Sequence, residues 1–395
     1  MLQDSKYCRD CGPLPVNHKE KYIDSFIDYL LPKINSKTIY RLFTPIRWLL
    51  KAIGLIRLEK DFSRDYISLR TTVFTDEAKK QGVICWATRT PFGYINEFVM
   101  QIGKKLVWFE GLPCTELSNS RYSMIIDDKF AVKKILKKHN IITPEGRSFW
   151  FFQKKQAIHY GLSLGFPLMI KPRGGSISHH ITTNITSEEK LKEGIERAIC
   201  YESCFIIERY LPNTHVFRAT VVDETFVACV ERVPAHVVGD DVHTIQELVT
   251  IKNTDPRRKE SPNKNTTHYH IVLDETSEEL LKEQGVTLLS VPKTGKTVFL
   301  QKKVILDLGA ELIEVTPIAH PDNIKLFREV AKLFGMKIVG VDFIGESIER
   351  SWKNQTCAII ELNSLPYIDM HHYPYTGKPQ NVAKAILEMA LKYYA

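Results

Sequence analysis

The chain has 395 residues, of which 44% are hydrophobic and 25% are charged, and its formal net charge is +8. This length allows two or three lobes, and the composition excludes a disordered or low-complexity protein and favours a soluble globular one. The lysines are spread along the chain, and no aromatic–basic stripe of the kind found in nucleic-acid-binding proteins is present. A mildly basic enzyme surface therefore explains the charge better than a nucleic-acid-binding surface does.

The N-terminal segment, MLQDSKYCRD, is polar and contains no recognisable signal peptide. The eight cysteines are scattered, which is typical of a reducing compartment, so we expect a cytoplasmic protein. Cys8 and Cys11 have the spacing of half a zinc site, but no second pair follows nearby. Zinc binding by this pair is therefore the less favoured alternative.

Two helical segments are predicted near the N-terminus. The first covers 22–31, and the second lies in 39–58, the most apolar part of this region. Arg41, Arg47 and Lys51 interrupt the second segment and exclude a transmembrane helix. Such a basic amphipathic stretch either lies on a membrane surface or packs on its own protein. We favour packing.

Residues 66–115 have the pattern of a small α/β unit. Its predicted strands are 82–87 and 105–109, and a predicted helix over 95–102 connects them. The unit has no GxGxxG motif, so a dinucleotide site is not predicted. Residues 110–126 form a linker.

A lysine-bearing helix is predicted after the linker, with Asp128 as its N-cap. Lys129 and Lys133 are four residues apart and share one face of this helix. Phe130, with the apolar residues near the end of the helix, contributes to a buried stripe. In isolation, the lysine face is most simply a solvated one.

Residues 167–171 form an apolar strand that ends in Lys171, and a loop of small residues with Gly175 and Ser176 follows. A lysine at a strand end and a loop with accessible N–H groups suit a phosphate group. A plain hairpin turn has the same pattern. A second apolar strand, 204–207, leads directly into a polar segment that begins at Glu208.

The middle of the chain predicts a β-hairpin, with strands 216–222 and 225–230 around Asp223 and Glu224. The stretch 231–303 is polar and irregular. Helices are predicted from there to the end of the chain at 244–252, 277–283, 323–334 and 381–394.

Oxygen-bearing side chains gather on the last two predicted strands. Asp342 lies in strand 337–344, and Glu361 and Asn363 follow the apolar run 358–360. Residues i and i+2 of a strand point to the same face, so Glu361 and Asn363 lie side by side. Three hard oxygen donors on neighbouring strands suit Mg²⁺, which usually arrives with nucleotide phosphates. The structural alternative is that Asp342 caps a strand end and Glu361 pairs with a surface lysine.

The order of these elements resembles the ATP-grasp superfamily over roughly residues 127–395. The resemblance is closest to the ATP-grasp module of cyanophycin synthetase and of the bifunctional glutamate–cysteine ligase/glutathione synthetase. Three stretches carry this narrower similarity: 231–258, which begins ERVPAHVVGD; 320–323, HPDN; and 361–379, which contains ELN, MHHYP and GKP. Such long matches are more specific than a lone DKxxxK helix.

The resemblance implies an α+β protein of the ATP-grasp fold, in which two α+β lobes clasp ATP after a small N-terminal α/β region. The expected limits are 1–115 for the N-terminal region and 127–395 for the ATP-grasp domain, with a lid-bearing subdomain at about 140–210. ATP and Mg²⁺, or Mn²⁺ in its place, are the implied cofactors.

The resemblance also implies roles for residues that match the family's motifs. The phosphate contacts are Lys129, Lys171, Gly175 and Ser176, and the adenine hinge is Glu208, Arg209, Tyr210 and Leu211. The metal ligands are Asp342, Glu361 and Asn363. Arg218 is the candidate catalytic residue, because a fixed cation can stabilise the charge of a transferred phosphoryl or acyl-phosphate group.

The chain departs from the family pattern in three places. Its lid loop is poorer in glycine, and Thr214-His215 stands where a ribose-contacting acid is expected. The stretch 306–311, LDLGAE, stands where the relatives have Ser-Thr-Gly-Gly. Because that stretch helps to form the acceptor side in the family, we expect a different acceptor. From the departures at the lid and at the ribose-contacting position, we expect weaker nucleotide affinity.

The resemblance implies an ADP-forming ligase that makes a peptide or amide bond through an acyl phosphate. The alternative is a non-catalytic nucleotide-binding protein derived from such a ligase. The expected partners are small amino-acid or peptide substrates and further copies of this chain, without nucleic acid and without a membrane.

Overall fold

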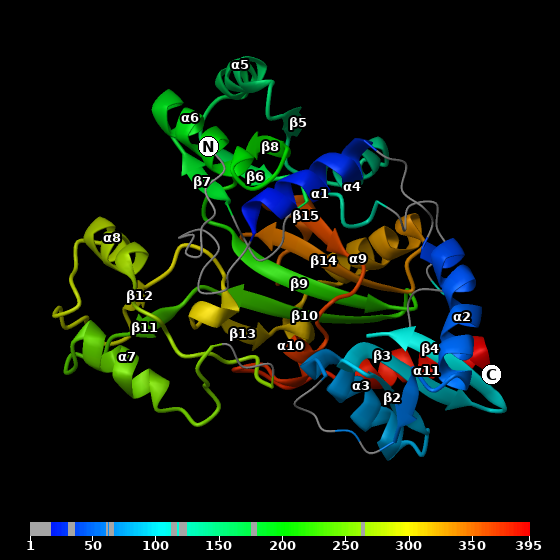
Figure 1. The fold of residues 1–395 in the computed structure, drawn as a ribbon. Coiled ribbons are helices and arrows are strands. Elements are labelled where there is room, and N and C mark those ends of the chain that lie inside the picture. Colours follow the sequence, from blue (N-terminus) through cyan, green and yellow to red (C-terminus); the bar gives the residue numbers. More distant parts are fainter. Residues whose placement is uncertain are drawn as a thin grey trace.

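The computed structural model describes residues 17–30, 36–60, 62, 67–111, 117, 125–174, 180–261 and 265–395 (Figure 1). Its centre is a five-stranded antiparallel sheet. The strands lie in the order β13 (Glu311–Glu314), β10 (Phe226–Val233), β9 (His215–Val222), β14 (Ile338–Gly345) and β15 (Cys357–Asn363).

The predicted hairpin is confirmed as β9 and β10, which join at Asp223 and Glu224. Both residues have a positive φ, 46° and 62°, and with Thr225 they form a three-residue loop between the paired residues Val222 and Phe226. The Asp223 carboxylate accepts a hydrogen bond from Lys392 Nζ at 2.9 Å and pairs with Lys337 Nζ at the same distance. These two lysines anchor the turn to its surroundings.

Alternate residues of the central sheet enter different apolar cores. On one face, Phe217 and Val341 pack with Leu136 of α4 (Lys129–Lys138) and Phe327 of α9 (Pro321–Phe334). On the other face, Val222, Ala228 and Ile338 pack under α11 (Val382–Tyr394) and α3 (Leu69–Lys80). The sheet is therefore covered on both sides, which explains its long apolar strands.

A second antiparallel sheet lies beside α11 (Figure 1). Its strands are β1 (Arg57–Glu59), β2 (Cys85–Thr90), β3 (Gly93–Ile102) and β4 (Lys105–Glu110). The predicted helix over 95–102 is wrong, because this segment is strand β3. Phe98 and Met100 face the core under α11, while Val99 faces Trp108 and a third core. Burial on both faces removes the alternation that identifies a strand in sequence.

The first hundred residues share a core with the end of the chain. Phe74 and Phe98 pack in one cluster with Ile386 and Leu387 of α11. The predicted limits at 115 and 127 therefore separate two stretches of sequence, whereas the hydrophobic core crosses them.

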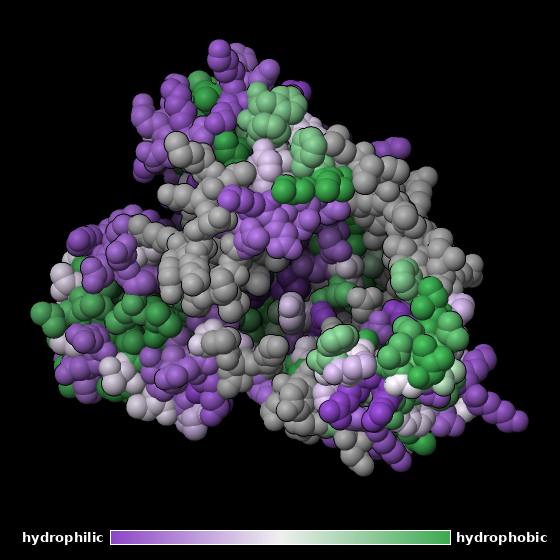
Figure 2. Space-filling view, in the orientation of Figure 1, coloured by the Kyte–Doolittle hydropathy of each residue, from purple (hydrophilic) through white to green (hydrophobic). Residues whose placement is uncertain are grey.

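The apolar segment at 39–58 forms helix α2 (Ser36–Ala52). Trp48 packs edge to face on Trp108 with ring centroids 5.4 Å apart, in agreement with the packing that we favoured. Phe43, Leu49 and Ile53 remain exposed, and Figure 2 shows a hydrophobic patch over this part of the molecule. Within the described residues, no helix combines the length and apolar character needed to cross a bilayer.

A smaller α/β lobe carries the predicted lid. Its sheet has the order β5 (Gly146–Trp150), β8 (Cys204–Arg209), β6 (Leu168–Pro172) and β7 (Thr182–Ile185), and α5 (Lys154–Leu164) and α6 (Glu188–Ile199) pack on it. Helix α1 (His18–Leu30), predicted over 22–31, docks on this lobe. Ser203 N donates to Ser25 Oγ at 3.0 Å, and Phe26 packs edge to face on Trp150.

A third module projects from the central sheet, at the left of Figure 1. It contains β11 (His236–Val238), β12 (Thr297–Phe299), α7 (Ile245–Asn253) and α8 (Glu275–Glu283), around a core of its own. The predicted helices at 244–252 and 277–283 are confirmed. Short turns complete the chain: η2 (Leu306–Leu308), η3 (Thr316–Ile318), η4 (Trp352–Asn354) and α10 (Asp369–His372).

Candidate active site

A cleft of about 2950 Å³ lies where the lid lobe, the central sheet and the third module meet. Figure 2 shows this region as a hollow with hydrophilic residues inside it. Every described residue that we predicted for the site lines the cleft: Lys129, Lys171, Glu208, Arg209, Tyr210, Leu211, Arg218, Asp342, Glu361 and Asn363. Gly175 and Ser176, like Cys8 and Cys11, lie outside the described residues.

Three charged residues form a row across the central sheet, which we call the charge row. Arg218 on β9 is directly opposite Asp342 on β14, and Asp342 is directly opposite Glu361 on β15. The Arg218 guanidinium donates through Nε and Nη2 to the two oxygens of Asp342, the second at 2.9 Å. Strand register thus aligns residues that are far apart in sequence.

Asn363 joins the end of the charge row, two residues after Glu361 and on the same face. With its amide nitrogen turned toward Glu361, it donates to Glu361 Oε1 at 3.2 Å and accepts from Arg218 Nη2 at 3.1 Å. The side-by-side arrangement of Glu361 and Asn363 predicted from their spacing is confirmed.

The buried carboxylate of Asp342 is held in its charged form. Burial alone raises its pKa, but the charge and hydrogen bonds of Arg218 outweigh burial and lower the pKa below its usual value. Arg232 Nη1 lies 3.7 Å from Asp342 Oδ2 and adds a second cation. Burial lowers the pKa of Arg232.

Lys129 connects the charge row to the lid lobe. Its Nζ lies 3.7 Å from Glu361 Oε2 and donates to the carbonyl of Gly174, where the small-residue loop begins. Asp128 caps helix α4 by accepting from the amides of Phe130 and Ala131, as predicted, and also pairs with Arg173 Nη2 at 2.6 Å. The start of α4 is therefore fixed against both lobes.

Glu208 is buried between two lysines. Lys171 Nζ lies 2.7 Å from Glu208 Oε1, and Lys133 Nζ binds Oε2. The two lysines outweigh burial and hold the pKa of Glu208 below its usual value, whereas burial lowers the pKa of Lys133 to about 8. Lys133 was not assigned to the site from sequence, because only the tertiary structure shows that its helix face is buried.

The segment after β8 forms a wall of the cleft, where we predicted the adenine hinge. Arg209 N donates to Glu145 O at 2.8 Å, and Tyr210 N donates to Pro167 O at 3.0 Å, so the hinge is tied to neighbouring strands. Further along this wall, His215 Nδ1 lies 2.6 Å from Glu231 Oε1. Glu231 thus brings a carboxylate close to the position of the expected ribose acid, from the part of β10 that extends beyond the predicted strand end at 230.

The donor set of the charge row suits a magnesium ion with few protein ligands. Glu361 and Asn363 offer hard oxygen atoms, and Mg²⁺ normally completes its shell with phosphate oxygens and water. Asp342 offers further oxygen atoms, which Arg218 holds in this structure. Among the described residues, no group of three or more His, Cys, Asp and Glu side chains is arranged to hold a metal. The assignment therefore depends on the amide of Asn363 and on phosphate ligands.

Comparisons with known proteins agree with this architecture. Cyanophycin synthetase from Trichormus variabilis is 37% identical over 263 residues, which are 66% of this chain and 29% of that protein. The glutathione biosynthesis bifunctional protein GshAB from Enterococcus faecalis is 30% identical over 294 residues, or 73% of this chain and 38% of that protein. No family model matches the chain.

A bifunctional glutathione synthetase from Pasteurella multocida has a similar structure, with a TM-score of 0.63 and 25% identity. The match covers 83% of this chain and 44% of that one. This chain belongs to the ATP-grasp superfamily. It spans about three-tenths of the length of the cyanophycin synthetases that it matches. ATP-grasp ligases use ATP and Mg²⁺, which fits the charge row and the lysines described above.

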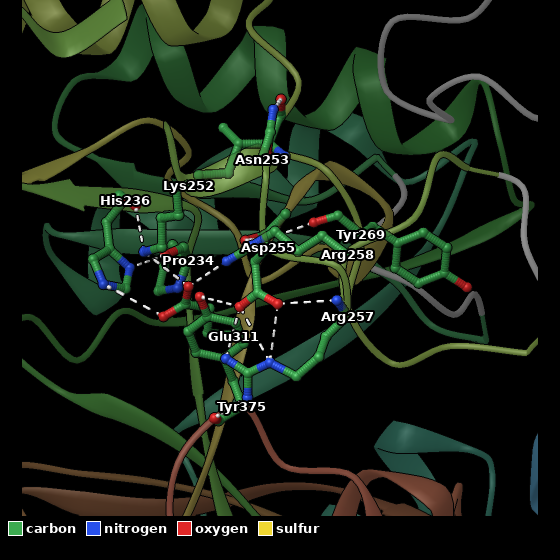
Figure 3. A network of polar contacts seen from close by, with 12 residues as sticks. Pro234, His236, Lys252, Asn253, Asp255, Arg257, Arg258, Tyr269, Glu311 and Tyr375 are labelled. Atoms are coloured by element: carbon green, nitrogen blue, oxygen red, sulfur yellow. Dashed lines mark hydrogen bonds and ion pairs between the residues drawn. The ribbon is translucent and has the colours of Figure 1, made fainter. Parts of the chain in front are cut away.

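The third module of this ATP-grasp protein is joined to the central sheet by a polar network around Glu311 (Figure 3). Arg258, Lys252 and His236 surround its buried carboxylate, with Lys252 Nζ at 2.8 Å and His236 Nε2 at 3.6 Å. Arg258 Nη1 also donates to the carbonyl of Tyr269 at 2.6 Å. Glu311 ends the stretch 306–311 that departs from the family pattern, and cations of the stretch 231–258 compensate its charge.

Proposed function

We propose that this ATP-grasp chain is an ADP-forming ligase that joins a carboxylate to an amine through an acyl phosphate. The observation that carries the proposal is the placement of the charge row, Lys129 and Lys171 around one cleft. A site for a nucleoside triphosphate and its metal needs cations, hard oxygen ligands and a cleft large enough for the nucleotide. This cleft has all three.

The proposed reaction has two steps. A carboxylate oxygen bonds to the γ-phosphorus of ATP, and ADP leaves with the bridging oxygen. The amine nitrogen then bonds to the acyl carbon, inorganic phosphate leaves, and the nitrogen loses a proton. Neither step requires a covalent bond to the protein, so the protein's contribution is positioning and charge stabilisation.

The side chains have separate roles in this proposal. Lys129 and Lys171 bind phosphate oxygens, and Glu361 and Asn363, with Asp342 behind them, hold Mg²⁺. Arg218 is held by Asp342 and Asn363, which orients its guanidinium toward charge that develops on the transferred group. The cleft exceeds a typical single-ligand pocket of roughly 300–1,000 Å³, so it has room for the nucleotide and two substrates.

The deciding experiment measures ADP release from ATP and Mg²⁺ in the presence of pooled amino acids, dipeptides and polyamines, with the products identified by mass spectrometry. The expected result is ADP together with a new mass equal to the two substrates minus one water. A folded protein that binds ATP but releases no ADP with any pool would favour the non-catalytic alternative. The loss of the expected ribose acid at Thr214-His215 is the feature that supports that alternative.

The remaining expectations are part of the same proposal. The substrates are small amino acids or peptides, without nucleic acid. We also propose that the protein is cytoplasmic. We further propose that it self-associates, and size-exclusion chromatography with light scattering tests this self-association directly.

A further inference from the structure

Two carboxylates lie on the wall of the cleft opposite the lid lobe. Asp307 belongs to η2 and Asp369 begins α10, and both line the same cleft as Arg218. Their chain neighbours Leu306 and Met370 pack in one apolar cluster, so the two turns meet although they are far apart in sequence. We call Asp307, Asp369 and the nearby Tyr269 and Tyr367 the acidic cluster.

Within the residues that the structure describes, the buried carboxylate of Asp369 is stabilised only by its own backbone N–H and by the charge of Arg70. Asp369 is only 8% exposed, and its Oδ1 has no hydrogen-bond partner among the described residues. Neither Asp307 nor Asp369 has an ion-pair partner within 4 Å in the described parts of the chain. A buried carboxylate without a partner is costly, and in a cleft wall such a group indicates a ligand of opposite charge.

The surroundings of the two carboxylates do not neutralise them. Arg70, whose charge acts on Asp369, is itself engaged elsewhere: it donates through Nη1 to Leu365 O at 2.7 Å and lies over the Tyr367 ring at 5.1 Å. Burial raises the pKa of Asp369 to about 6, and the hydrogen bond with its own backbone and the charge of Arg70 only partly oppose this rise. Burial likewise raises the pKa of Asp307. The cluster therefore retains a deficit of positive charge.

The aromatic members complete a surface that suits an organic cation. Tyr269 lines the same cleft as both carboxylates, and burial, with the charges of Asp307 and Asp369, raises the pKa of its hydroxyl to about 12. Tyr367 is 57% exposed and its hydroxyl interacts electrostatically with Arg218, so the cluster adjoins the proposed reaction centre. Aromatic rings next to carboxylates bind ammonium and guanidinium groups through cation–π contacts and ion pairs.

The polar network of Figure 3 holds this wall in place. Arg258 Nη1 donates to the carbonyls of Tyr269 at 2.6 Å and Gly309 at 3.4 Å. Gly309 has φ +94°, and a Cβ there would lie 2.6 Å from Ile271 Cα, so the turn that presents Asp307 requires glycine. The position of Asp307 is thus set by buried contacts.

We propose that Asp307 and Asp369 bind the amine substrate and select one with positive charge beyond the reacting nitrogen, such as an aliphatic diamine, a polyamine or a basic amino acid. The proposal rests on the proposed ligase function for the assignment of this wall to the amine. An amine that carries a side-chain carboxylate in place of the second cation, such as aspartate, would be repelled by the same two groups. A metal ion fits less well, because no third acidic, histidine or cysteine ligand joins them among the described residues.

The test is calorimetric titration of the full chain in the presence of MgADP. The probes are putrescine, spermidine and L-arginine, with L-alanine and L-aspartate for contrast. The wild-type chain is expected to bind at least one cationic probe more tightly than either contrast amino acid. Asp307→Asn and Asp369→Asn should each weaken that binding about tenfold or more, with MgADP affinity unchanged.

Two further variants sharpen the test. Glu193→Gln removes a carboxylate from the same cleft, on α6, and is expected to leave cation binding unchanged. Asp307→Lys is expected to reverse the preference toward L-aspartate. Because asparagine is isosteric with aspartate, the variants are expected to fold, and thermal melting verifies this before titration.

The proposal is overturned if no cationic probe binds, if the wild-type chain prefers L-aspartate, or if both asparagine variants bind the cations as tightly as the wild type does. These results differ from a failure of the ligase proposal, because the titration requires no turnover. ADP formation with an anionic amine would keep the ligase function and reject cation selection. Cation binding without ADP formation with any substrate pool would keep the cation site and reject the ligase function.

Discussion

The charge row and the acidic cluster lie in the same cleft but treat buried charge in opposite ways. In the charge row, Arg218 binds Asp342, Lys129 approaches Glu361, and Asn363 bridges two neighbours. In the acidic cluster, Asp369 is buried with an oxygen that has no partner in the described residues. Compensated charges give a rigid, preorganised surface, whereas an uncompensated charge lowers stability until a ligand arrives.

This difference indicates which part of the cleft is common to ATP-grasp proteins and which part belongs to this chain. The charge row occupies the sites that the resemblance assigned to phosphate and metal. The acidic cluster includes Asp307, which lies in the stretch 306–311 where the chain departs from the family pattern. The comparison can be tested by removing charge from each side.

The largest expected effect is the loss of stability in Arg218→Met. This change leaves the buried Asp342 carboxylate without its main partner and should destabilise the fold by about 3–5 kcal/mol. Chemical denaturation measures the loss. The double variant Arg218→Met/Asp342→Asn should recover most of it, and a single variant as stable as the wild type would show that the pair is not structurally important.

Asp369→Asn is expected to change the free energy of unfolding in the opposite direction and to stabilise the fold at high pH. Burial raises the pKa of Asp369 from 3.8 to about 6 in the folded state, so the folded protein binds this proton more tightly than the unfolded chain does. Stability contributed by Asp369 is present below about pH 4 and is lost as the pH rises toward 6.

Asp369→Asn removes that loss and should stabilise the protein at pH 8 by up to about 3 kcal/mol, with no gain at pH 4. Thermal melts at both pH values measure the effect. Equal shifts at the two pH values would contradict the raised pKa. A gain in stability together with weaker cation binding would be the signature of a group kept for function.

Glu361→Gln tests the charge row for catalysis. Removing this carboxylate should lower Mg²⁺-dependent ADP formation by on the order of a hundredfold, because the proposed metal loses its most accessible ligand. Steady-state kinetics at several Mg²⁺ concentrations measure the change, and Glu193→Gln is the matched control. If activity survived in Glu361→Gln, the metal assignment would be wrong.

The smallest effect is expected at Glu231, which pairs with His215 on the hinge wall. Glu231→Gln should weaken MgADP binding by roughly threefold to tenfold, the loss of about one charge-assisted hydrogen bond. Equilibrium dialysis measures the affinity. An unchanged dissociation constant would show that Glu231 does not replace the expected ribose contact.

Much of this protein was predictable from local sequence. Apolar runs identified β9, β10, β14 and the strand that leads into Glu361, and the i, i+2 spacing placed Glu361 beside Asn363. The N-cap at Asp128 and the shared face of Lys129 and Lys133 were also correct. These features depend on interactions within a few residues, which the sequence determines directly.

The prediction that failed depended on more distant contacts. The segment 95–102 is a strand because α11 covers one of its faces and Trp48 with Trp108 covers the other. A segment that is apolar on both faces has no period, so its sequence alone does not distinguish a buried strand from a buried helix.

Only the tertiary structure decided which charges meet. Register between β9, β14 and β15 placed Arg218, Asp342 and Glu361 in one row, and the docking of the lid lobe buried Glu208 between two lysines. The placement of Asp307 and Asp369 in one cleft likewise depends on packing between η2 and α10. Register and packing result from the burial of the whole core, so residues far apart in sequence are brought together by contacts that no local pattern contains.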